Sequence, residues 1–332
     1  MTLKYFRSIA LGFVLSCLGF FIAASIQVNA PTPTSQWIYD LYIAKKNIAQ
    51  ELSSPKLVVA AGSNAMVGIS CWQIQQETGT PCLNGAINVG LGLDYILHQA
   101  RSFLASGDTV LLPLEYELYE SSMQPSSVAI DYVFARDFGY WQSTDYLTKM
   151  RFLFGLGFKR TLMGLIHKLS QPASEFKSVN RLQSIDRAGD WIKNRPQDLT
   201  PDHQRRLLLL HSYQGDQLRI NDRSRQKIAE FISWCNEHQV EVLATWPNTL
   251  EYPEYQQPQY QGFFASIKAF YHEQNVALIG EPEDYMYDRS LLFDSTYHLN
   301  ARGVAIRTAQ LIESLSSCQP NSAAFCLAKI QD

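Results

Sequence analysis

Residues 293–303 bring an acid, an imidazole and the start of a helix together within one short stretch of chain. In neutral imidazole one nitrogen donates a hydrogen bond and the other accepts one. A neighbouring carboxylate can therefore fix the tautomer and leave the second nitrogen to take a proton from a nucleophile. His298 is the candidate general base, and Asp294, four residues earlier, is the candidate orienting acid. Alternatively, Asp288 partners the imidazole, or His298 simply caps or packs against the last helix.

A candidate nucleophile lies far upstream, where an apolar run that begins at Leu57 ends at Gly62, Ser63 and Asn64. A buried strand that breaks at glycine and turns into a helix exposes the next side chain at the carboxyl edge of the sheet, where open α/β folds place their sites. The backbone N–H groups that follow would lie at a helix N-terminus, where they can stabilise an oxyanion. The sequence therefore predicts Ser63 as a nucleophile, with a helix N-cap as the alternative role.

Other polar groups follow the next predicted strands. Gly90 and Gly92 would let the backbone approach a ligand and present N–H groups to an oxyanion, or they form a plain turn. Glu115 emerges at the same sheet edge as Ser63. Asn248 follows the fourth strand and either donates to a substrate or makes a turn.

The aromatic residues near these strand ends allow two interpretations. They form a platform on which a sugar stacks, or they belong to the core; the residues are Tyr116, Tyr119 and Trp246.

Taken together, these segments resemble the SGNH (GDSL-like) hydrolase superfamily, in which a Ser, a Gly, an Asn and an Asp-x-x-His block occur in this order. The matching segments are residues 62–64, 88–92, 113–116 and 294–303. Glu115 stands where the family has the oxyanion-binding Asn, and it could help an oxyanion only if protonated or turned away. The resemblance and the strand ends together assign three sets of roles. The catalytic residues are Ser63, His298 and Asp294, and the oxyanion donors are Ser63, Gly92 and Gly90. The substrate contacts are Asn64, Glu115, Tyr116 and Asn248.

The resemblance is nearest to membrane-anchored envelope members and implies a serine esterase or O-acyltransferase that acts on an acylated glycan. An acyl donor and other proteins that modify envelope polysaccharides are the implied partners. The alternatives are a non-catalytic scaffold of an envelope polysaccharide modification or export complex and a glycan-binding component. No Cys/His spacing suggests a zinc site, and no cofactor is expected.

The first part of the chain predicts a membrane anchor. Residues 8–28 are almost wholly apolar and uncharged, and Lys4 and Arg7 precede them. About 20 apolar residues suit a bilayer, and the positive residues would stay in the cytoplasm, so the rest of the chain is expected in the periplasm or outside the cell. The alternative is a signal peptide cleaved after Ala30. The net charge of −3 shows no excess of positive residues, so nucleic acid is not an expected partner.

The remaining pattern predicts a fold. Strands at 57–61, 81–87, 108–114, 240–245 and 276–279 alternate with helices, which favours a three-layer flavodoxin-like sandwich with a five-stranded parallel sheet. We expect an anchor and linker over residues 1–34 and one domain over 35–332, with a helical insertion at about 120–222. Within it, residues 152–169 suit a helix at the membrane interface, a lid over the site or a buried cap helix, and residues 171–205 suit a mobile loop.

The six cysteines fit an oxidising compartment. A disulfide between Cys318 and Cys326 is expected in such a compartment, and Cys71 and Cys82 could form a second one. Connectivity cannot be read from sequence, and each of these residues is alternatively a buried thiol. Cys235 lies within a helical pattern and is expected as a buried thiol.

Overall fold

The computed structural model describes residues 2–121, 124–170 and 182–316. The chain forms two compact units. Unit 1 contains Met1–Tyr39 and Gln124–Ser178, and unit 2 contains Asp40–Met123 and Val179–Asp332. The insertion that the sequence predicts is therefore divided between the two units.

Unit 2 is built on the five-stranded parallel sheet that the sequence predicts. Its strands follow the order β2-β1-β3-β4-β6. Strand β1 lies between β2 and β3, and Val58 is in register with Leu83 on one side and Val110 on the other. Every residue of β1, β2 and β3 is buried, which is typical of parallel strands covered on both faces. The strands are β1 (Leu57–Val59), β2 (Cys82–Asn84), β3 (Thr109–Leu112), β4 (Glu241–Thr245) and β6 (Ala277–Ile279).

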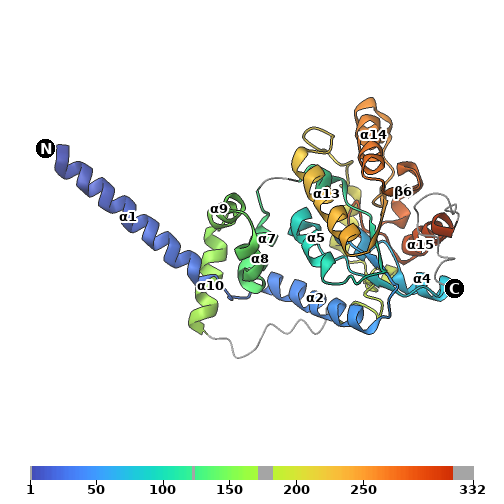
Figure 1. Cartoon of the computed structure of the whole chain (residues 1–332), viewed down its shortest axis with the longest axis horizontal. Helices are drawn as coiled ribbons and strands as arrows, with labels where there is room; N and C mark the ends of the chain where they lie inside the picture. Colours follow the sequence, from blue (N-terminus) through green and yellow to red (C-terminus); the bar gives the residue numbers. More distant parts are fainter. Residues whose placement is uncertain (1, 122–123, 171–181, 317–332) are drawn as a thin grey trace. The chain divides into compact units, whose positions relative to one another are not determined.

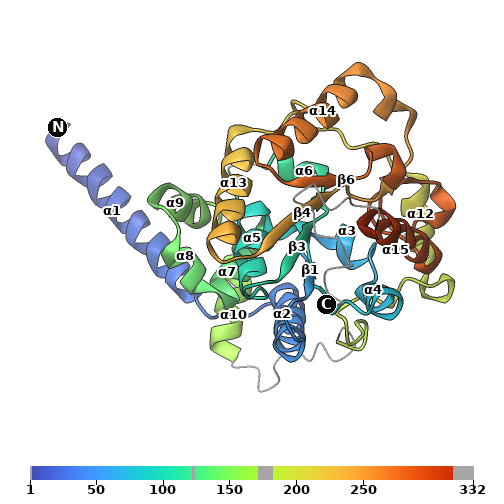
Figure 2. The ribbon, with the colours of Figure 1, turned by 45° about the vertical axis from the view of Figure 1, so that its right-hand side comes forward.

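Helices cover both faces of this sheet. Figure 2 shows α5 and α13 on one side of the central strands and α4 and α15 on the other, and each of these two pairs is in contact. A small second sheet pairs β5 (Thr249–Leu250) with β7 (Met286–Tyr287). The helices of unit 2 are α3 (Ser63–Met66), α4 (Cys71–Thr78), α5 (Leu93–Arg101), α6 (Tyr116–Tyr119), α12 (Pro201–Leu208), α13 (Asp222–Glu237), α14 (Pro258–Glu273) and α15 (Ala301–Ser316).

Unit 1 is helical and contains the apolar N-terminal helix α1 (Thr2–Ile26). Its segment Tyr5–Ile26 has 22 residues with a mean hydropathy of 2.4, and its side chains are mostly exposed. At 1.5 Å per residue this segment is about 33 Å long, enough for a hydrocarbon core of about 30 Å. The other helices are α7 (Ser127–Arg136), α8 (Phe138–Ser143), α9 (Tyr146–Phe154) and α10 (Phe158–Ser170), and α2 (Pro33–Glu51) runs from unit 1 into unit 2 (Figure 1).

Part of the segment 171–205 is held in place, contrary to the mobile loop that the sequence predicts. Asp190 is buried and accepts hydrogen bonds from the N–H groups of Cys71 and Trp72, both at 2.8 Å, and from the Ser70 hydroxyl at 2.9 Å. These donors belong to the first turn of α4 and its N-cap, where a carboxylate satisfies N–H groups that have no partner within the helix. Residues around Asp190 therefore form part of unit 2.

A disulfide joins Cys71, at the start of α4, to Cys82, at the start of β2. Cys235 is a buried free thiol, and both observations confirm the sequence-based expectations. The expected pair Cys318 and Cys326 lies outside the described residues.

We expect this disulfide to contribute to the stability of unit 2. Its two cysteines are separated by 11 residues in sequence. Closing a loop of this size stabilises a fold by about 2–3 kcal/mol, chiefly by restricting the unfolded chain. Replacing Cys71 and Cys82 together with Ser should lower the free energy of unfolding by about this amount, measured by denaturant titration. Replacing Cys235 with Ser is the control without a cross-link. Alkylation of Cys71 and Cys82 in unreduced protein isolated directly from cells would contradict this prediction.

Candidate active site

Ser63 is the first residue of α3, directly after β1 and the short link that follows it. The turn needs glycine at position 62, because a Cβ there would lie 2.3 Å from Glu115 Oε1 and 2.6 Å from Val89 Cβ. The N-cap of α3 is Gly62, which has no side chain to cap the helix, so the alternative N-cap role of Ser63 is wrong. The Ser63 side chain is half-buried and remains accessible.

His298 lies on a loop that its own backbone closes. The Phe293 N–H donates to the His298 carbonyl oxygen at 2.8 Å, and the neighbouring Leu292 and Leu299 form an antiparallel bridge. The Leu299 N–H donates to the carbonyl oxygen of Val67, the residue that follows α3, at 3.1 Å. These bonds attach the loop that carries His298 (residues 292–299, the histidine loop) to the turn that carries Ser63 (residues 62–64, the serine turn).

Ser63, His298 and Asp294 form a hydrogen-bonded chain. His298 Nε2 lies 2.9 Å from Ser63 Oγ, and His298 Nδ1 lies 2.6 Å from Asp294 Oδ1. The imidazole and the carboxylate are 21% and 20% exposed, so they are mostly shielded but not sealed. An ionised Asp294 has no proton to donate, so the proton in its hydrogen bond with His298 is on Nδ1. Nε2 is then unprotonated and can accept the serine proton. The four-residue spacing between acid and base is therefore compatible with a triad.

The electrostatics of Asp294 fit this role. Burial alone would raise the pKa of Asp294, but the hydrogen bond from His298 and the nearby charges of His298, His203 and Arg206 lower the pKa below its usual value. Asp294 is thus ionised at neutral pH. The alternative partner, Asp288, instead accepts from the Ser290 N–H at 2.8 Å as the N-cap of a short 3-10 helix, so that alternative is wrong.

Glu115 supports the serine turn through hydrogen bonds to its backbone. It is 1% exposed and accepts hydrogen bonds from the N–H groups of Gly62, at 3.0 Å, and Asn64, at 3.1 Å. Burial raises the pKa of Glu115 to about 8, although the two N–H donors oppose this shift and Glu117 adds to it. Glu115 is therefore not turned away from the turn. It uses the two N–H groups on either side of Ser63, while the Ser63 N–H has no hydrogen-bond partner among the described residues.

The expected oxyanion donors Gly90 and Gly92 are engaged elsewhere. The Gly90 N–H donates to Asn88 Oδ1 at 2.8 Å, and the Gly92 N–H donates to the Val89 carbonyl oxygen at 2.9 Å. Residues 89–91 form one turn of 3-10 helix, in which the Gly90 N–H is capped by the Asn88 side chain and the Gly92 N–H closes the backbone turn. The alternative of a plain turn leading into α5 describes this segment, and the prediction of two glycine donors is wrong for this conformation.

Three of the expected substrate contacts are buried structural residues. Asn64 is fully buried and donates to the Pro113 carbonyl oxygen at 2.7 Å. Asn248 is also fully buried and donates to the carbonyl oxygen of Tyr297, the neighbour of His298. Tyr116 is 0% exposed, so it cannot contact a substrate. The proposed sugar-stacking platform is wrong for the same reason, since its remaining members are 1% exposed: Tyr119 and Trp246.

Asn84, which the sequence analysis did not select, supports the serine turn. Its amide nitrogen donates to the carbonyl oxygens of Ala65 and Ile69, both at 3.0 Å. These bonds fix the chain that follows Ser63. An Asn at the end of a buried strand is the only signal that could have identified it, because such a group must find partners when buried.

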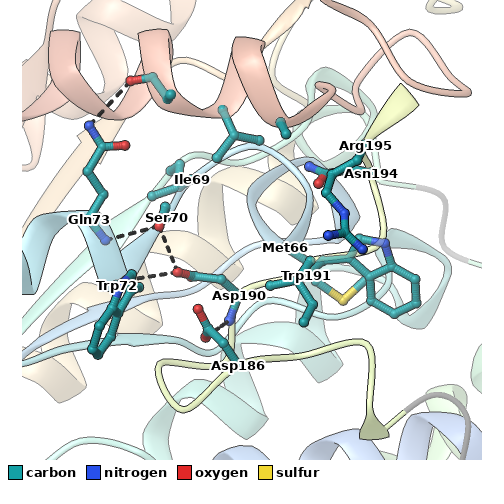
Figure 3. A pocket seen from close by; sticks show the side chains of 14 residues that line it. Met66, Ile69, Ser70, Trp72, Gln73, Asp186, Asp190, Trp191, Asn194 and Arg195 are labelled. Atoms are coloured by element: carbon teal, nitrogen blue, oxygen red, sulfur yellow. Dashed lines mark hydrogen bonds between the residues drawn. The ribbon is translucent and has the colours of Figure 1, made fainter. Parts of the chain in front are cut away.

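Two cavities of unit 2 flank the triad without being lined by Ser63 or His298. One has a volume of about 570 Å³ and is lined by residues 294–297 together with Glu117, Arg206 and residues 209–214. The other has a volume of about 380 Å³, and Met66 of α3 forms part of its wall. Figure 3 shows Trp72, Trp191 and Arg195 around the second cavity and Asp190 hydrogen-bonded to Ser70.

Among the described residues, no three His, Cys, Asp or Glu side chains lie together as a metal site requires. No known protein family and no curated protein matches the chain by sequence. The site is defined by its geometry, in which a hydroxyl, a base and an ionised acid are joined in series.

Proposed function

We propose that this protein is a serine esterase or O-acyltransferase. The supporting observation is the hydrogen-bonded series in which His298 Nε2 is 2.9 Å from Ser63 Oγ and Nδ1 is 2.6 Å from Asp294. Ser63 Oγ forms a bond to the acyl carbonyl carbon, and its proton passes to His298 Nε2. The bond to the leaving alkoxide then breaks, and His298 returns the proton to that oxygen. Water or a sugar hydroxyl releases the acyl group from Ser63 by the same steps.

The Ser63 N–H is the donor that this proposal assigns to the oxyanion. It lies at the start of α3 and has no partner among the described residues, so it can bind the oxygen that becomes negative. Glu115 keeps this N–H in place through the residues on either side. Burial raises the pKa of Glu115 to about 8, which favours the neutral carboxyl near pH 7 and so reduces repulsion of the oxyanion.

The proposed substrate is an acylated glycan of the cell surface or an exopolysaccharide, and the proposed location is the outer side of a membrane. The resemblance to SGNH hydrolases supports the substrate class, and three of its four matching segments follow strands β1, β2 and β3 of the five-stranded sheet: residues 62–64, 88–92 and 113–116. The apolar helix α1 and the Cys71–Cys82 disulfide support an anchored domain in an oxidising compartment.

A second candidate function is a non-catalytic scaffold or glycan-binding component of an envelope complex. The observation that favours it is the loss of two expected oxyanion donors, since the N–H groups of Gly90 and Gly92 are both engaged. A site with a single backbone donor would stabilise the transition state less, by about 3–4 kcal/mol for one missing donor.

A fluorophosphonate probe separates the two candidates, because it reacts only with an activated serine. The full chain in detergent should be labelled at Ser63, as located by mass spectrometry, and Ser63→Ala should remove the label. Ser102→Ala, an exposed serine of unit 2, is the matched control and should keep it. A folded wild-type protein that stays unlabelled would replace the enzyme proposal with the scaffold.

A further inference from the structure

Helix α10 of unit 1 presents an apolar face that no described part of the chain covers. Phe158 is 83% exposed and Leu169 is 77% exposed. The other exposed apolar residues of this helix are Leu162, Leu165 and Ile166. At about 100° per residue these five side chains lie on one side of the helix. Within unit 1 this face of α10 is exposed, unlike the face of a buried cap helix.

The opposite side of α10 is fixed to the end of α1. The Arg160 guanidinium donates to the carbonyl oxygens of Gln27, at 3.3 Å, and Ala30, at 2.9 Å, and it pairs with Asp131 at 2.7 Å. These carbonyls follow the last turn of α1, where backbone acceptors need partners from outside the helix. Gly164 allows the close approach, since a Cβ there would lie 2.0 Å from Gln27 Oε1. The position of α10 along α1 is thus set by specific contacts.

A ring contact places the C-terminal end of α9 beside the apolar part of α1. Phe154, the last residue of α9, stacks on Phe20 with the ring centroids 5.9 Å apart. Phe20 lies six residues before the end of α1 at Ile26, which corresponds to about 9 Å along the helix axis. A leaflet of the hydrocarbon core is about 15 Å thick. If α1 crosses a bilayer, Phe154 lies at a depth occupied by lipid chains.

The charges of α10 also suit a lipid surface. Lys159 and Lys168 are exposed and lie to either side of the apolar face, and the helix contains no acidic residue. Lysines that border an apolar face are typical of helices that lie in the interface, where the ammonium groups reach the headgroup phosphates. Figure 1 shows α10 crossing α1 close to its C-terminal end.

We propose that the C-terminal end of α9 and the apolar face of α10 insert into the same bilayer that α1 crosses, in the leaflet from which the C-terminal end of α1 emerges. This inference rests on the proposed role of α1 as an anchor. The occupant of the apolar face is lipid acyl chains, because the face is continuous through Phe154 and Phe20 with a helix of bilayer length. Unit 1 is then a membrane-embedded platform attached by two elements, rather than a single helix followed by a flexible stalk.

Fluorescence quenching by lipids tests this proposal in the full chain. Dansylalanine is placed at position 158 by codon suppression, and the protein is reconstituted into phosphatidylcholine vesicles that contain doxyl-labelled phosphatidylcholine. Position 9 in α1 is the positive control, since Ile9 is 72% exposed, and position 208 in α12 of unit 2 is the matched exposed control, since Leu208 is 76% exposed. We expect roughly half of the emission at positions 158 and 9 to be lost, and little at 208.

The outcomes separate this proposal from the anchor on which it rests. Quenching at position 9 without quenching at 158 overturns the insertion of α10 and keeps the anchor, and it would assign the apolar face to a protein partner or a second copy. An absence of quenching at both positions overturns the anchor as well. Equal quenching at 158 and 208 would also overturn the proposal, because it would show non-specific contact with lipid.

Discussion

Replacing Ser63 or His298 with Ala is expected to reduce turnover of an activated acyl ester by on the order of 10⁴-fold or more, and the double replacement to cost little beyond either single change. The two side chains share one proton path through the 2.9 Å contact between Nε2 and Oγ, so loss of either member removes the function of the other. Hydrolysis of a nitrophenyl ester by the full chain measures this effect, with thermal unfolding to confirm that each variant is folded.

The acid member of the triad has a matched control on the same loop region. Asp294→Asn removes the charge that stabilises the protonated imidazole and favours the wrong tautomer, so it should reduce turnover strongly, though less than Ser63→Ala. Asp288→Asn changes an exposed carboxylate that only caps a short helix, and turnover should stay within about twofold of wild type because Asn is an equally good cap. Wild-type turnover in folded Ser63→Ala would disprove the enzyme proposal. Equal loss in the two Asp variants would disprove the assigned role of Asp294.

The second large effect is expected at Glu115, whose removal leaves two buried N–H groups without an acceptor. Each unsatisfied N–H of Gly62 and Asn64 costs about 1–3 kcal/mol, so Glu115→Ala should lower both the stability of unit 2 and the turnover. The serine turn would lose its support and Ser63 its fixed position against His298. Glu251→Gln, a change at an exposed carboxylate, is the control and should leave both quantities unchanged.

Glu115→Gln tests the protonation state through pH. The pKa of Glu115 is about 8 in the folded protein and near its ordinary value of 4.5 in the unfolded chain. Between these values the folded state keeps a proton that the unfolded state releases, so the free energy of unfolding falls as pH rises, by at most about 1.4 kcal/mol per unit. Gln cannot ionise, and the variant should lack this decline.

If the proposed esterase activity is correct, the same titration predicts how that activity depends on pH. Above about pH 8 the ionised Glu115 lies against the serine turn and opposes the developing oxyanion, so kcat/KM of the wild type should fall. In Glu115→Gln this alkaline decline should be absent, although the lost acceptor lowers activity at pH 7. Parallel profiles of unfolding temperature and kcat/KM against pH for the two proteins would show both effects. Identical profiles would mean that Glu115 does not titrate in this range.

Much of the architecture could be predicted because it depends on local patterns. Apolar runs separated by helical periodicity identified all five strands, and Gly79, in the left-handed conformation, ends α4 where expected. The placement of Ser63 and Glu115 at one edge of the sheet also followed from sequence order. The carboxyl ends of parallel strands lie on one side of the sheet whatever the side chains that pack between them.

Only the tertiary structure decided which polar groups remain available for chemistry. Glu115 and Asn64 both follow strands and look alike as site residues, yet each is buried and used to hold the serine turn. The sequence does not show whether the N–H of Gly90 meets a ligand or Asn88, because that depends on loop conformation. The sequence shows that the segment of α10 is amphipathic. It does not show that Arg160, on the polar side, binds the end of α1 and that the apolar side stays exposed. Burial and pairing arise from contacts between segments far apart in the chain, and periodicity carries no information about those contacts.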